Sequence, residues 1–224
     1  MTGTTDSTRE AVLRRVPLLA GIGDTALAQL AAASHVTTVD RGEILFVEGE
    51  PSTRMFVVLS GRVRIFRNSE AGAELVLSHA GPGESIGELS VIDELPRSAS
   101  AQAVERCRVI SVPADQMREA LSQSPGAMLA VARHLAVTVR RLTGTTSDFI
   151  FLDLPHRLAK YLLALPMGDG ATVVLPASQS GIAAQLGVTR QSLNQALGAL
   201  AQAGLIAVDG RAVRVLDLAA LENF

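Results

Sequence analysis

The sequence predicts an α+β protein: an antiparallel β-sandwich or barrel, then a long helix, then a winged helix-turn-helix. Between about Thr37 and Val112, short runs rich in Val and Ile alternate with Gly, Pro, Ser and Asn turns. This pattern is typical of antiparallel sandwiches and barrels. From Ser124 to about Asp148 apolar residues recur at helical spacing, and separate helix and hairpin signals follow.

Composition limits the class of protein. Of the 224 residues, 48% are hydrophobic and 19% are charged, which is enough apolar material to bury real cores. No apolar run approaches the ~18 residues of a membrane span. The start, MTGTTDSTRE, lacks the basic and then apolar order of a signal peptide. We therefore expect a cytoplasmic protein with no membrane partner.

Metal, haem and catalytic chemistry have little support in the sequence. The single cysteine, Cys107, excludes an intrachain disulfide and a cysteine-built iron–sulfur or metal cluster. The four histidines are scattered without ligand spacing, so we expect no haem and no metal. His134 follows Arg133 on the long helix and is expected at the surface. No nucleophile–base motif indicates an enzyme.

The N-terminal elements follow from local signals. Residues 11 to 34 are expected to form short helices, with Asp24 as a possible cap of the second. Six runs are then expected to hold strands: EILFVEG, RMFVVLSG, RVRIFRN, ELVLSHAG, SAQAVE and CRVISVP. In VRIFR, alternation places Val63 and Ile65 on one face.

The long helix carries a heptad pattern. Apolar positions recur at alternating spacings of four and three: Met128, Ala132, Leu135, Val139, Leu142, Thr146 and Phe149. This stripe favours a dimer helix, and an ordinary amphipathic helix lying on its own sheet is the alternative. Asp153 can cap a new helix with Pro155 in its first turn, which marks a hinge. We therefore expect domains at 1–123, 124–150 and 151–224.

The last domain has the pattern of a DNA-binding unit. Ser178 can cap a helix through Leu186, Gly187 breaks it, and Thr189 caps a second helix from Arg190. Asp209-Gly210 is a type I′ hairpin signal that predicts a turn between two strands. A helix-turn-helix followed by such a hairpin predicts a winged helix. The alternative is a plain three-helix packing unit with a polar outer face. We expect the DNA-binding residues to be Ser178, Thr189, Arg190, Gln191, Ser192, Gln195 and Arg211.

This DNA binding must rest on local clustering. The chain has a net charge of −2. Residues 152–224 contain five basic residues (Arg and Lys) and five acidic residues (Asp and Glu). Bulk charge therefore supplies no electrostatic attraction to nucleic acid. Aromatic residues are only 3% of the chain, so a base-stacking platform for single strands is not expected.

The stretch GPGESIGELSVIDELPRSAS, residues 81–100, is the most informative part of the expected β-region. Three glycines lie within seven residues and are followed by Glu88, and Arg97 comes nine residues after Glu88. Glycine lets the backbone approach a ligand closely, and an arginine fork suits a phosphate. The stretch predicts a small anion site.

These motifs resemble the cyclic-AMP receptor protein and fumarate–nitrate reduction regulator (CRP/FNR) family over almost the whole chain. GEILFVEGEPSTRMFVVLSGRVRIF is similar to that family's glycine-punctuated barrel, and IGELSVIDELPRSASA to its phosphate-binding cassette. The resemblance implies a jelly-roll, cyclic-nucleotide-binding-like barrel (a double-stranded β-helix) and a homodimeric transcription regulator. Its implied partners are a palindromic double-stranded DNA operator, RNA polymerase and a cyclic nucleotide, with cyclic AMP as the best single candidate.

The resemblance also assigns residues. Glu88 would bond a ribose 2′-hydroxyl, and Arg97 and Ser98 would hold the cyclic phosphate, helped by backbone N–H groups from Gly87 to Leu89. In family members regulated by cyclic AMP, adjacent polar residues of the long helix meet the purine. Those positions fall on Leu142 and Thr143, and Leu142 cannot bond an exocyclic amine.

The recognition helix departs from the family as well. It reads Arg190-Gln191-Ser192 where Arg-Glu-Thr or Arg-Glu-Ser is usual, and Gln195 stands where a basic residue is common. Two alternatives stay open. One is a ligand-independent regulator with a vestigial pocket, in which Glu88 and Arg97 simply pair. The other is a nucleotide-binding or scaffolding module that does not bind DNA.

Overall fold

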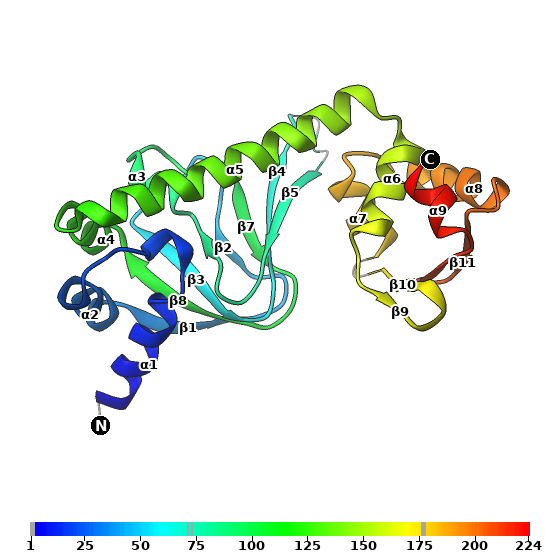
Figure 1. The fold of residues 1–224 in the computed structure, drawn as a ribbon. Coiled ribbons are helices and arrows are strands. Elements are labelled where there is room, and N and C mark those ends of the chain that lie inside the picture. The colour runs from blue at the N-terminus through cyan, green and yellow to red at the C-terminus, as the bar shows by residue number, and fades with distance from the viewer. Residues whose placement is uncertain (1–2, 71, 73, 176–177) are drawn as a thin grey trace. The chain divides into compact units, whose positions relative to one another are not determined.

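The computed structural model describes residues 3–70, 72, 74–175 and 178–224 (Figure 1). The chain forms two compact units. The first contains Met1–Asn68 and Leu77–Val139, and the second contains Ser69–Val76 and Arg140–Phe224. Among the described residues, none of the helices combines the length and apolar character that a bilayer span requires.

Two four-stranded sheets form the β-structure between His35 and Pro113, and their described pairings are antiparallel. One sheet has the order β1 (His35–Val39), β8 (Cys107–Pro113), β3 (Arg54–Ser60) and β6 (Ser85–Ile86). The other has the order β2 (Ile44–Phe46), β7 (Ser100–Ala103), β4 (Val63–Asn68) and β5 (Glu74–Ala80). All six runs expected to hold strands do so. The expected β-region begins slightly later than β1, and the two-residue β6 was not predicted.

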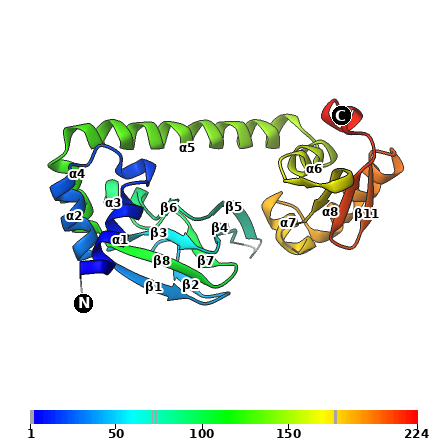
Figure 2. The same ribbon diagram turned by 60° about the horizontal axis from the view of Figure 1, so that its bottom comes forward.

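Side chains of β8 contribute to two hydrophobic cores, one on each face of the strand. Cys107 and Val109 join the core between the sheets, together with Val58 and Val63. Ile110, on the opposite face, joins the core formed with the helices. Those helices are α1 (Gly3–Leu13), η1 (Pro17–Leu19), α2 (Asp24–Ala33), α3 (Leu89–Ile92) and α4 (Ala114–Ser122). Figure 2 shows β1, β8 and β3 side by side, with α1, α2 and α4 gathered at one end.

The expected cap of α2 is wrong. Gly23 occupies the N-cap position and makes no side-chain cap bond. Asp24 is instead the first helical residue, and its Oδ1 lies 2.5 Å from Nη1 of Arg14. A carboxylate in the first turn still favours the positive end of the helix dipole.

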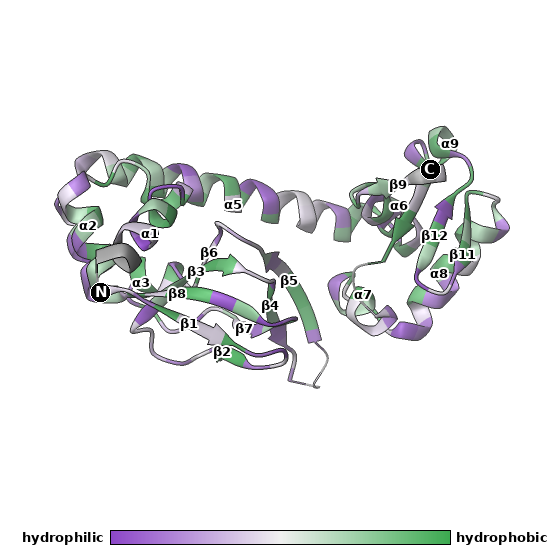
Figure 3. Ribbon diagram, turned by 90° about the horizontal axis from the view of Figure 1, so that it is seen from below, coloured by the Kyte–Doolittle hydropathy of each residue, from purple (hydrophilic) through white to green (hydrophobic). Residues whose placement is uncertain are grey.

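The long helix α5 (Pro125–Phe151) extends three residues beyond the expected end and has two apolar faces. Ala127, Ala130 and Val131 are buried. Met128 and Val139, which belong to the predicted heptad stripe, remain 56% and 60% exposed. Bands of hydrophobic and hydrophilic residues accordingly alternate along α5 in Figure 3.

The second unit contains a helical core with a small sheet. Its helices are α6 (Leu154–Leu163), α7 (Gln179–Gln185), α8 (Arg190–Gln202) and α9 (Leu218–Glu222), with η2 (Asp169–Ala171). The sheet has the order β11 (Ile206–Asp209), β12 (Ala212–Val215), β10 (Thr172–Val174) and β9 (Met167–Gly168). As predicted, Asp153 caps α6 and accepts the N–H of His156 at 3.1 Å. Ile182, Leu193 and Leu197 lie in the core between α7 and α8.

The wing hairpin forms, but its predicted turn type is wrong. Asp209 pairs with Ala212 in the ladder, so the two-residue loop is Gly210-Arg211. Gly210 has a φ of +58°, and Arg211 is not among the described residues with positive φ. A type I′ turn needs positive φ at both loop positions. The glycine supplies the left-handed residue one position earlier in the loop than the dipeptide signal implied.

Candidate functional site

Within residues 81–100, the backbone at Gly87 lies against the side chain of Arg97. It has a φ of +74°, a left-handed conformation that glycine adopts at no steric cost. A Cβ at this position would overlap the Arg97 guanidinium and lie 3.1 Å from the Phe46 ring. Only glycine therefore allows this close approach of loop and arginine.

The Arg97 side chain is buried, at 5% exposure. Its Nη1 donates to the Gly87 carbonyl at 2.7 Å and its Nη2 to the Arg54 carbonyl at 2.5 Å. The guanidinium carbon lies 4.0 Å above the centre of the Phe46 ring. Its Nε is buried and has no hydrogen-bond partner within the described chain. The buried guanidinium thus retains an unused donor at Nε.

The electrostatics of Arg97 suit an anionic ligand. Burial lowers the pKa of the Arg97 guanidinium, and the nearby carboxylates of Glu50 and Glu88 act in the opposite direction. The direct acceptors of this cation are neutral carbonyl groups, which leave much of its desolvation cost uncompensated. A phosphate would supply both the missing charge and an acceptor for Nε. The residues present therefore fit a phosphate-bearing ligand.

Glu88 does not pair with Arg97. It occupies the N-cap position of α3, and its side chain is 13% exposed. Its Oε1 lies 3.4 Å from Nε2 of His134 on α5. His134 was expected at the surface, but its side chain is only 22% exposed and faces Glu88. A Glu88–Arg97 ion pair is thus absent from the described chain. Such a pair would have given both residues a purely structural role.

The other predicted ligand residues are less constrained. Leu89 is half-buried and Ser98 is exposed. Leu142 and Thr143 lie further along α5, in the second unit, where Leu142 is 47% exposed. Their contact with a purine stays a prediction.

The predicted DNA-binding residues of the second unit include two helix caps. The Ser178 hydroxyl accepts the Gly181 N–H at 3.2 Å, and the Thr189 hydroxyl accepts the Ser192 N–H at 3.1 Å. The hydroxyls of Thr189 and Ser192 are 2.9 Å apart. Ser178 therefore fixes the start of α7, and Thr189 with Ser192 fixes the start of α8 after the turn between the two helices.

The start of α8 presents a polar face. Arg190, Gln191 and Gln195 are exposed, and so is Asn194, which the sequence reasoning missed. Helical spacing of four places Asn194 beside Arg190, and that spacing could have identified it. Arg190 Nε donates to Gln179 Oε1 at 3.2 Å. Guanidinium and amide groups are the side chains that read guanine and adenine edges.

Arg211 has a contact that its expected DNA role did not anticipate. Its Nε and Nη2 donate to the Leu175 carbonyl at 3.1 and 2.6 Å. The side chain therefore ties the wing loop to the end of β10. Its contact with DNA stays a prediction.

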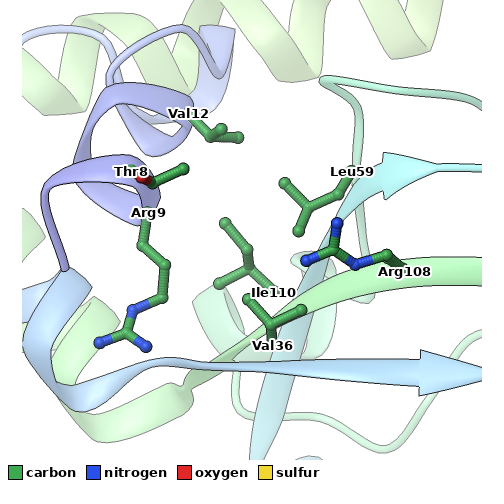
Figure 4. A pocket seen from close by; sticks show the side chains of 7 residues that line it. All are labelled: Thr8, Arg9, Val12, Val36, Leu59, Arg108 and Ile110. Carbon is green, nitrogen blue, oxygen red and sulfur yellow. The ribbon is translucent and has the colours of Figure 1, made fainter. Parts of the chain in front are cut away.

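A separate hollow of about 450 Å³ lies between α1 and the sheet of β1, β8 and β3 (Figure 4). It is lined by Thr8, Arg9, Val12, Val36, Leu59, Arg108 and Ile110. None of these residues belongs to residues 81–100 or to α8. Elsewhere, Cys107 is a buried thiol within 3.2 Å of the Arg62 carbonyl, and burial raises its pKa. Within the described ranges no three His, Cys, Asp or Glu side chains form a metal-type cluster.

A double β-sheet region, a long helix and a winged helix-turn-helix together form the architecture of a transcription regulator. Residues 36–124 match the cyclic nucleotide-binding domain, and residues 156–224 match the Crp-like helix-turn-helix domain. The chain is 33% identical over 212 residues to the CRP-like cAMP-activated global transcriptional regulator of Mycobacterium tuberculosis, covering 92% of this chain and 95% of the relative. The chain belongs to the CRP/FNR family of transcription regulators.

Other relatives agree with this assignment. The cyclic AMP receptor protein of Thermus thermophilus is 31% identical, over 82% of this chain and 84% of its own length. A solved CRP-family regulator from the same organism has a TM-score of 0.67 at 28% identity, covering 84% of this chain and 95% of that one. The c-di-GMP responsive regulator CLP of Xanthomonas campestris shares the fold, with a TM-score of 0.76 at 23% identity, covering 87% of this chain and all of that one.

Proposed function

We propose that this transcription regulator is a homodimer that binds a palindromic DNA operator and is modulated by cyclic AMP bound at residues 81–100. The single observation that supports a phosphate ligand is the burial of the Arg97 guanidinium. It donates to neutral carbonyl groups, and its Nε has no hydrogen-bond partner within the described chain. A cyclic phosphate matches that unpaired charge. Glu88, 13% exposed and not engaged by Arg97, is available for a ribose hydroxyl.

Cyclic AMP is favoured among phosphate ligands. Two relatives above 30% identity are named for cyclic AMP. The cassette residues that would bind ribose and phosphate, Glu88, Arg97 and Ser98, are all present. A single charge-assisted bond contributes about 1.5–3 kcal/mol net, so enclosure around the nucleotide must supply the rest of the affinity.

The exposed stripe of α5 supports a homodimer. Met128, Val139, Leu142 and Phe149 are 41–60% exposed and recur at heptad spacing. A second copy of the same helix is the partner that such spacing fits, because knobs-into-holes packing buries both stripes at once. A two-fold dimer would present two copies of α8 to a palindromic operator in the cytoplasm, where RNA polymerase is the expected further partner.

Two linked measurements test the proposal. Isothermal titration with cyclic AMP and cyclic GMP measures the ligand, and retardation of promoter fragments with and without each nucleotide measures its effect on DNA binding. We expect cyclic AMP to bind and to increase operator affinity. Operator binding that ignores both nucleotides would replace this proposal with a ligand-independent regulator. Nucleotide binding without any DNA retardation would indicate a module that does not regulate transcription.

A further inference from the structure

His134 links the long helix to the loop that carries Glu88. Its Nε2 lies 3.4 Å from Glu88 Oε1, and both side chains are largely shielded from water. His134 extends the inner face of α5, three residues after the buried Val131 and four after the buried Ala130. Both partners belong to the first unit.

The contact with His134 leaves one oxygen of the Glu88 carboxylate, Oε2, available to accept a hydrogen bond from a ligand. An ionised carboxylate accepts hydrogen bonds at both oxygens, whereas the Nε2–H of His134 uses only one. Within the described chain Oε2 has no protein hydrogen-bond partner. The imidazole can donate as the Nε2–H tautomer or as the imidazolium, so the contact does not depend on one protonation state.

We propose that His134 is a positioning residue that holds Glu88 so that Oε2 faces the ribose 2′-hydroxyl of the ligand. This inference rests on the proposed function. Burial lowers the pKa of the Arg97 guanidinium, and the nearby charges of Glu50 and Glu88 act in the opposite direction. Without His134 the flexible carboxylate is free to turn toward that cation and away from the ribose. Discrimination between ribose and deoxyribose therefore depends on a residue of the long helix.

Full-length His134→Ala tests this role by titration with cyclic AMP and with its 2′-deoxy analogue. We expect the wild type to prefer the ribonucleotide. The preference should fall by about three- to tenfold in His134→Ala, the range expected for one lost hydrogen bond. His134→Gln, whose amide can donate to Glu88, should retain most of the preference. Arg133→Ala is the matched control, because Arg133 is the exposed neighbour on the same helix and makes no such contact.

Three results would overturn the inference. They are an unchanged preference in His134→Ala, an equal loss in Arg133→Ala, or a wild type that binds both nucleotides equally. If the wild type bound neither nucleotide, the proposed ligand would fail separately. The urea unfolding midpoints of Glu88→Gln, His134→Ala and the double variant would then decide whether His134 holds Glu88. Additive shifts would refute the contact, and non-additive shifts would support it.

Discussion

Arg97 is buried with a positive charge that the protein only partly matches, and this gives the first prediction at the scale of single residues. Arg97→Ala should abolish detectable cyclic AMP binding, because the phosphate loses its only matched side-chain charge. Glu88→Ala should weaken binding less, since water can replace a hydroxyl contact more easily. Isothermal titration measures both. Arg108→Ala, an exposed arginine outside residues 81–100, is the control. Wild-type affinity in Arg97→Ala would disprove the cassette hypothesis.

The sequence predicts some of the residues around Arg97 and not others. Gly87, Glu88 and Arg97 lie within eleven positions, so local composition is enough to suggest that they act together. Phe46 stacks on Arg97 from a strand far away in the sequence, and only the fold brings it there. His134 was misplaced because the heptad stripe defines one face of α5, whereas His134 lies on the other.

Helix caps provide the first prediction at the scale of elements. Asp153 caps α6, and its pKa is lowered by hydrogen bonds from the ring and then from the backbone N–H of His156. Asp153→Ala should destabilise the protein by about 0.5–2 kcal/mol near neutral pH. Urea unfolding measures this loss. Glu222→Ala, an exposed acid in α9, should change stability little.

The pH dependence of this cap has a definite sign. The folded pKa of Asp153 lies below the unfolded value, which is about 3.9 for aspartate. The stabilisation is therefore fully present above the unfolded pKa and is lost as the pH falls through the folded pKa. The difference between wild type and Asp153→Ala should shrink in that acidic window. A difference that stayed constant down to full protonation would contradict the ionised cap.

Several helix caps with local signals were predictable, whereas the short strand β6, fixed by tertiary pairing, was not. The caps at Asp153, Ser178 and Thr189 are single-residue signals with a direct physical cause, and all three form. Strand β6 has two residues and exists because Phe56 and Val57 of β3 pair with it. No periodicity can be read from so short a run, which is why the sequence did not indicate it.

The recognition helix α8 gives a prediction about DNA. Arg190 is exposed and should contact a guanine through two hydrogen bonds, as arginine often does in the major groove. Gln191 replaces a glutamate that would accept from cytosine, and it can both donate and accept. We therefore expect a palindromic site with half-sites about 34 Å apart but an altered half-site sequence. Selection from random DNA measures it, and recovery of the family's usual palindrome unchanged would refute the altered specificity.

At the scale of the whole molecule, the apolar stripe of α5 is where the proposed dimer contact and the proposed ligand response meet. Leu142 occupies both a heptad position and the position at which the family resemblance places a polar contact to the purine. It is 47% exposed in the single chain. A leucine in the seam should stabilise the dimer helix whether or not a nucleotide is bound. The same side chain cannot bond the exocyclic amine of adenine.

These two effects of Leu142 predict weak ligand control. A poorly paired amine costs about 1–3 kcal/mol, or roughly ten- to hundredfold in affinity. We therefore expect weak or poorly discriminating cyclic AMP binding and appreciable operator binding by the ligand-free dimer. Leu142→Thr should strengthen nucleotide binding and make operator binding depend more on it, as titration and DNA retardation would show. Leu142→Met, which keeps an apolar side chain in the seam, is the control. Tight wild-type affinity for cyclic AMP, strong preference over cyclic GMP and no ligand-free operator binding would together exclude this role for Leu142.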